Sequence, residues 1–66
     1  MWLAVNKDGQ EVLLYSDAEP IRMPEGYWLP NDVDTILEND MIYVYDGFIE
    51  RNFGDELTWE DDAVEY

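Results

Sequence analysis

The sequence contains no cysteine and no histidine, and its only serine is Ser16. Without cysteine there is neither a disulfide framework nor a thiolate site, which suits a reducing cytosol. The commonest general base and the thiol nucleophile are therefore both missing, and no base lies beside Ser16 in the sequence. We expect no enzymatic activity, no catalytic residue and no cofactor.

Long apolar runs are also missing from the N-terminus. Residues Met1 to Lys7 have neither a basic start nor an extended apolar stretch. We therefore expect no signal peptide, no membrane span and a mature chain that begins at or near Met1. These features predict a cytoplasmic protein with no membrane partner.

Basic residues are scarce, because Lys7, Arg22 and Arg51 oppose seventeen acidic residues and the formal net charge is -14. Direct binding to DNA or RNA requires lysine and arginine to neutralise phosphates, so this balance argues against it. A net charge of about 2 to 8 in magnitude keeps an ordinary small domain soluble. The larger excess costs stability through self-repulsion, and we interpret it as complementarity to a basic partner surface.

High net charge is typical of disordered chains, but the aromatic content argues for a folded core. A chain of 66 residues predicts a single domain over residues 1–66, which we expect to be monomeric. The aromatic residues are Trp2, Tyr15, Tyr27, Trp28, Tyr43, Tyr45, Phe48, Phe53, Trp59 and Tyr66.

The first half of the sequence predicts mainly strands and loops. Apolar runs over residues 2–5 and 12–15 flank Asp8-Gly9, which predicts an antiparallel hairpin. Residues 16–26 contain two prolines and a glycine, which favour a loop along one side of the sheet. A short strand is predicted over residues 27–29 and should end at Pro30.

The second half predicts one strand and one short helix. Residues 33–38 fit either a short helix or an edge strand, and residues 41–45 fit a strand. Asp46 should cap a helix that starts at Gly47 and ends at Gly54. The predicted buried side of this helix is Phe48, Ile49 and Phe53, and a final turn or short strand follows over residues 63–66. The predicted fold class is therefore α+β, with an antiparallel sheet of about four strands, one short helix and one wet sheet face.

In the last twelve residues, apolar side chains lie between groups of acidic ones. We expect the apolar residues Leu57, Trp59, Val64 and Tyr66 to face inward while the carboxylates face water. Thr58 and Asp61 have the spacing of a capping box. The first candidate partner-binding residues are Asp55, Glu56, Glu60, Asp61 and Asp62, with Trp59 among them.

A second acidic group precedes the strand at residues 41–45 and contains Asp32, Asp34, Glu38 and Asp40. Its spacing is loosely that of a calcium loop, but the central glycine and the final bidentate glutamate are missing. We assign no metal, and a weak nonspecific divalent-cation site stays open as an alternative. The group is the second candidate contact for a basic partner.

Carboxylates displayed at regular spacing can occupy a basic groove that normally holds a nucleic acid. Duplex DNA carries about one negative charge per 1.7 Å of axis, and same-face side chains on a strand repeat at roughly 6.6 Å. Two or three neighbouring acidic strands or loops would approach the charge density of DNA. Aromatic residues at the contact would add specificity, and Trp28, Trp59 and Tyr66 are the candidates, although packing in the core is the favoured interpretation for each of them. The alternative hypothesis is a small acidic regulatory or structural protein that binds its partner by adding a strand at a sheet edge.

Three motifs resemble a class of small acidic phage-encoded proteins: Trp2-Leu-Ala-Val-Asn-Lys-Asp-Gly9, Gly47-Phe-Ile-Glu-Arg-Asn-Phe-Gly54 and Leu57-Thr-Trp-Glu-Asp61. Residues 16–40 depart from that pattern. The size, acidity and aromatic content are further similar to anti-CRISPR proteins, above all to inhibitors of the type I-C system. The resemblance implies a protein of the bacterial host cytoplasm. It also implies binding to a subunit of the surveillance complex, at the basic surface that engages target DNA, so that recognition of the duplex fails.

Overall fold

The computed structural model describes residues 1–31 and 41–66. The choice between strand and helix over residues 33–38, and the second acidic group, Asp32, Asp34, Glu38 and Asp40, therefore lie outside the described residues. The described elements are β1 (Trp2–Val5), β2 (Glu11–Leu14), β3 (Ala18–Arg22), β4 (Trp28–Asn31), β5 (Met41–Tyr43), α1 (Phe48–Phe53) and β6 (Val64–Glu65).

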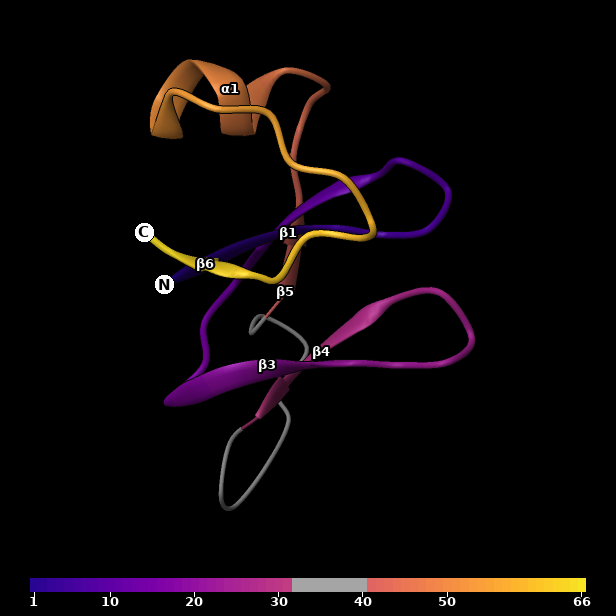
Figure 1. Cartoon of the computed structure of the whole chain (residues 1–66). Helices are drawn as coiled ribbons and strands as arrows, with labels where there is room; N and C mark the ends of the chain where they lie inside the picture. The colour runs from indigo at the N-terminus through magenta and orange to yellow at the C-terminus, as the bar shows by residue number, and fades with distance from the viewer. Residues whose placement is uncertain (32–40) are drawn as a thin grey trace.

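The elements form three layers. A four-stranded antiparallel sheet has the order β5-β2-β1-β6, and β3 pairs with β4 in a separate two-stranded sheet. Figure 1 shows α1 on one side of the larger sheet and the β3–β4 hairpin on the other. The predicted α+β class is confirmed, with one short helix among the described residues.

The first hairpin forms where the sequence predicts it. The register of β1 and β2 pairs Trp2 with Leu14 and Val5 with Glu11. The Asn6 N–H donates to the Gln10 carbonyl, and Gly9, with φ of 93°, closes the turn through an N–H bond to the Asn6 carbonyl. Glycine adopts this left-handed backbone without the steric cost of a side chain.

The prediction of a loop over residues 16–26 is wrong, because β3 occupies residues 18–22. The ladder between β3 and β4 is irregular between Ala18 and Ile21, and Pro20 lies within that irregularity. Proline lacks an N–H, so a strand tolerates it where the ladder is already interrupted. The next strand also extends past its predicted end at Pro30, to Asn31, whereas β5 ends at Tyr43, two residues earlier than predicted.

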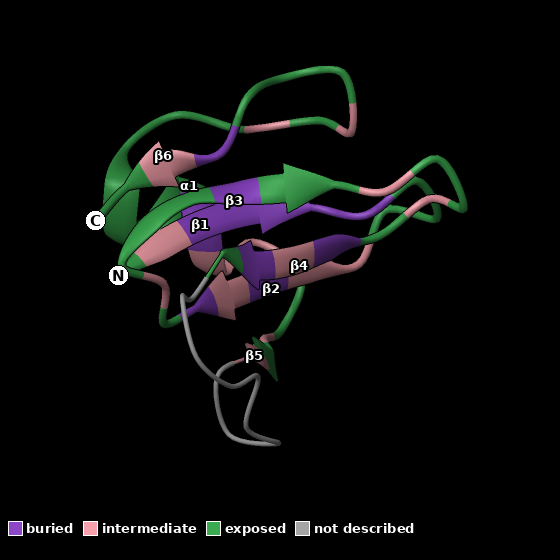
Figure 2. Cartoon of the chain, turned by 90° about the horizontal axis from the view of Figure 1, so that it is seen from below, coloured by how far each residue is buried: buried purple, intermediate pink, exposed green. Residues whose placement is uncertain are grey.

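Both faces of the four-stranded sheet are covered, so the expectation of one wet face is wrong. On one face the buried residues Ala4, Val12 and Leu14 cluster with Trp28 and Ala63. On the other face the buried residues Leu3 and Val5 cluster with Ile49 of α1. Figure 2 shows that the buried positions concentrate in β1, β2 and β4. The exposed acidic residues of the described part of the chain lie in loops, on α1, on β3 and on β6.

The two hairpin turns are joined to each other near Trp28. Asn6, which is buried, accepts the Trp28 N–H through its Oδ1, and the Trp28 indole N–H donates to the Val5 carbonyl at 2.9 Å. The Lys7 N–H donates to the Gly26 carbonyl at 2.8 Å. Gly26 has φ of 110°, and a Cβ there would lie 3.0 Å from the Lys7 Cβ, so this approach requires glycine.

Candidate functional site

The candidate site includes α1, whose N-terminus is bound by a side chain from the larger sheet. Glu11 lies on β2, and its two carboxylate oxygens accept the N–H groups of Gly47 and Ile49 at 2.7 and 2.8 Å. The predicted capping by Asp46 is wrong, because the N-cap residue is Gly47 and no side chain of its own caps the helix. Glu11 and Gly47 are 36 residues apart, and no local pattern in the sequence marks the pair.

The other end of α1 follows the sequence prediction in part. Gly54 adopts the left-handed conformation with φ of 103°, and its N–H donates to the Glu50 carbonyl. Ile49 is buried and Phe48 packs beside it. Phe53 is 39% exposed, so its predicted burial is wrong. Ile49 and Phe53 are four residues apart and share one face of the helix, but Phe53 is the last residue of α1 and lies at the end of that face.

Beyond Gly54, the chain carries the acidic segment, which we define as residues 55–62. Leu57 packs with the Leu3, Val5 and Ile49 cluster, whereas Trp59 packs with the cluster on the opposite sheet face. The segment therefore passes from the helix side of the sheet to the hairpin side. Leu57, Trp59 and Val64 face inward as predicted, but Tyr66 is 46% exposed, and its predicted inward position is wrong.

The turn within the acidic segment is closed by one of its own carboxylates. Asp61 Oδ2 accepts the Thr58 N–H at 2.8 Å and the Thr58 hydroxyl at 3.2 Å, and the Asp61 N–H donates to the Thr58 carbonyl. The capping-box spacing of the sequence thus produces a turn. Asp61 shapes the segment in addition to carrying charge.

Arg22, at the end of β3, holds the segment from outside. Its guanidinium donates to the carbonyls of Trp59 and Asp61 at 3.0 and 2.9 Å. It also lies 4.8 Å from the ring centroid of Trp28 and 5.2 Å from that of Trp59. The two indoles meet edge to face with centroids 5.9 Å apart. No local pattern in the sequence marks this cluster, because it joins residues from β3, β4 and the acidic segment.

We expect Arg22→Ala to loosen the acidic segment without unfolding the sheet. The change removes two charge-assisted hydrogen bonds and two cation–π contacts at an exposed site, which corresponds to roughly tenfold faster exchange of the Thr58 and Asp61 amides. Hydrogen exchange measured by NMR checks this. Arg51→Ala, in the last turn of α1, is the matched control and should leave these two amides unchanged. Equal exchange in both variants would contradict the anchoring role.

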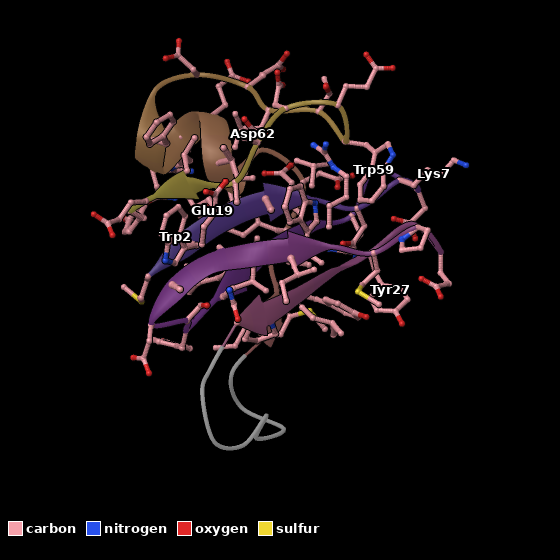
Figure 3. The ribbon with its side chains drawn as sticks, turned by 60° about the horizontal axis from the view of Figure 1, so that its bottom comes forward. Trp2, Lys7, Glu19, Tyr27, Trp59 and Asp62 are labelled. Carbon is pink, nitrogen blue, oxygen red and sulfur yellow. The ribbon has the colours of Figure 1, made fainter. Side chains whose placement is uncertain are left out.

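The carboxylates of the segment face solvent. Asp55, Glu56, Glu60, Asp61 and Asp62 are all exposed. Figure 3 shows oxygen-tipped side chains projecting from this part of the chain. From Asp46 to Glu65 the sequence holds eight acidic residues, and Arg51 is the one base.

The tryptophan candidates for partner contact differ in their exposure to solvent. Trp28 is 2% exposed, so it belongs to the core, which is the favoured interpretation for this residue, and it is not available as a contact residue. Trp59 is half-buried, with part of its indole used in the Trp28 and Arg22 contacts. Its outer part borders an open groove together with Lys7, Thr58 and Glu60.

The described residues contain no group of three or more side chains placed to hold a metal ion. Nor does the described part of the chain include a helix with the length and apolar character needed to cross a membrane. Comparison of the chain with protein-family models, curated proteins and solved structures finds no match.

Proposed function

We propose that this protein is an anti-CRISPR inhibitor that binds the basic, DNA-engaging surface of a CRISPR surveillance complex by negative-charge mimicry of DNA. The observation that carries the proposal is the acidic segment, whose five carboxylate residues are all exposed while its apolar residues are packed on the core. The charge is thus displayed by a folded surface.

Anchoring of the segment supports binding as well as display. Leu57 and Trp59 fix it to the two cores, Asp61 closes its turn, and Arg22 holds two of its carbonyls. Segments that are ordered before binding lose less conformational entropy in the complex. A large net charge of one sign also accelerates association with an oppositely charged surface.

The choice of partner rests on the sequence resemblance. The motifs at Gly47 to Gly54 and Leu57 to Asp61, which resemble phage-encoded proteins, are the ones that build α1 and the acidic segment. A type I-C surveillance complex is therefore the first partner to test. Its basic channel would meet the carboxylates in place of target-strand phosphates.

The test is a band shift of target DNA with purified type I-C surveillance complex, with and without an excess of this protein. We expect the shifted band to be lost. Direct binding of the protein to the complex, measured without DNA, should weaken between ionic strengths of about 0.01 M and 0.15 M, where the screening length falls from about 30 Å to about 8 Å. The band shift is also run at these two ionic strengths. If the protein leaves the DNA band shift unchanged at both, DNA mimicry is excluded for this complex.

One observation favours a second function, binding by strand addition. β5 is an edge strand of the larger sheet, and its residues Ile42 and Tyr43 are 42% and 65% exposed. A partner strand could pair with this edge through backbone hydrogen bonds. Such binding would be insensitive to salt and blocked by Tyr43→Pro, in contrast to binding through the acidic segment. The Val44 N–H donates to the Glu11 carbonyl of β2, so the Tyr43 N–H points away from β2, and a proline at position 43 removes an outward donor without breaking the ladder.

A further inference from the structure

An open groove of about 650 Å³ lies between the β1–β2 turn, the β3–β4 turn and β5. This volume lies within the range of about 300 to 1,000 Å³ that is usual for sites that hold an organic group. The chemically informative lining residues are Asp8, Glu25, Tyr27, Leu29, Met41 and Tyr43. None of them belongs to the acidic segment.

The groove combines an apolar interior with an acidic and aromatic outer part. Leu29 and Met41 are half-buried, whereas Tyr27 and Tyr43 are exposed. Asp8 and Glu25, one from each hairpin turn, are exposed as well. The chain therefore places two carboxylates and two phenol rings around one apolar floor.

The two turns that form this groove are held at a fixed separation. The Lys7 N–H bonds to the Gly26 carbonyl across them, and Asp8 Oδ1 accepts the Gln10 N–H within the first turn. Lys7 is the one basic residue of the lining. Figure 3 shows its side chain extending away from Tyr27.

The combination selects one kind of ligand. Carboxylates repel phosphates and attract cations, and phenol rings attract cations through their faces. A guanidinium fits better than an ammonium, because it is planar, stacks on aromatic rings and is more weakly hydrated. The same chain already uses this pairing internally, since the Arg22 guanidinium lies over the rings of Trp28 and Trp59.

We propose that the groove between the two hairpin turns and β5 binds an arginine side chain of a basic partner protein. The flanking peptide would lie along the apolar floor formed by Leu29 and Met41, with Asp8 and Glu25 at the mouth. This surface is separate from the acidic segment, and the proposal does not rest on the identity of the surveillance complex.

The test uses the full chain labelled with ¹⁵N, titrated with a hexa-arginine peptide and, separately, with a hexa-lysine peptide of the same formal charge. If only long-range attraction to a chain of net charge -14 drives binding, the two peptides should have the same affinity. We expect tighter binding of hexa-arginine, with the largest amide shifts at residues 8, 25–29 and 41–43. Equal affinities with shifts centred on residues 55–62 would overturn the proposal.

Two matched pairs of variants locate the binding. Tyr43→Leu should lower the affinity for hexa-arginine about 2- to 5-fold, as expected for one exposed cation–π contact, while Tyr15→Leu, at an exposed tyrosine outside the groove, should not. Glu25→Gln should reduce the affinity more than Glu19→Gln, which removes the same charge. In Figure 3, Glu19 lies near Trp2 at one end of the β3–β4 hairpin, and Tyr27 lies at the other end.

These positions are exposed, so the variants should keep the dispersed amide spectrum of the parent chain. Tyr43→Leu behaving like Tyr15→Leu, or Glu25→Gln like Glu19→Gln, would overturn the proposal. Because no surveillance complex enters this test, its result is independent of the DNA band shift. If the inhibitor hypothesis fails in the band shift, a preference for arginine peptides can still be observed. If the arginine preference fails, the band shift still tests the inhibitor hypothesis.

Discussion

We expect Glu11→Ala to lower the melting temperature more than any other single exposed or half-buried acid. Its carboxylate accepts two backbone N–H groups at the start of α1, at 2.7 and 2.8 Å. Truncation removes both charge-assisted bonds and leaves two helix donors without their partner, at a cost of about 2 to 4 kcal/mol. In a domain of this size that corresponds to roughly 10 to 25 °C.

The matched control for this prediction is Glu19→Ala, which removes the same charge from an exposed position on β3 and should leave the melting temperature nearly unchanged. Glu11→Gln should fall between the two, because its amide keeps one acceptor oxygen and turns an N–H₂ group toward a helix donor. Thermal unfolding followed by far-UV circular dichroism gives all three values. Equal melting temperatures for Glu11→Ala and Glu19→Ala would show that Glu11 does not hold the helix.

The contact between Glu11 and α1 is an example of a feature that this sequence does not predict. Features encoded by nearby residues are predicted correctly: the turn at Asp8-Gly9, the helix end at Gly54 and the capping-box bond from the Thr58 N–H to Asp61. Each depends on backbone conformations or side-chain bonds within about four residues. Asp46 was the local choice of cap, but a carboxylate from β2 takes that role once the sheet and helix meet.

The errors share this physical cause. Pro20 argues against a strand when it is read alone, yet β3 forms because β4 supplies a partner with an irregular register around it. The Arg22 cluster and the groove near Tyr27 depend on how the β3–β4 hairpin crosses the larger sheet. Composition predicted an acidic surface correctly. The packing of Leu57 and Trp59 and the hydrogen bonds of Arg22 show how the acidic segment is held.

The acidic segment leads to the prediction with the largest effect on binding. We expect Glu56→Lys with Glu60→Lys to reduce affinity for the proposed partner, a surveillance complex, at least about tenfold, because association becomes slower and dissociation faster at the reversed charges. Both side chains are exposed, so the fold should persist. Asp61 is deliberately kept, because its carboxylate closes the turn with Thr58.

The control is Glu19→Lys with Glu65→Lys, on β3 and β6, which changes the net charge of -14 by the same amount. If long-range attraction alone drives binding, both double variants lose affinity equally, and the acidic segment is not the contact. If the segment is the contact, the Glu56 and Glu60 pair loses much more, because those reversed charges meet basic side chains at close range. Surface plasmon resonance at one fixed salt concentration distinguishes the two results, since the shared change in net charge affects both variants in the same way.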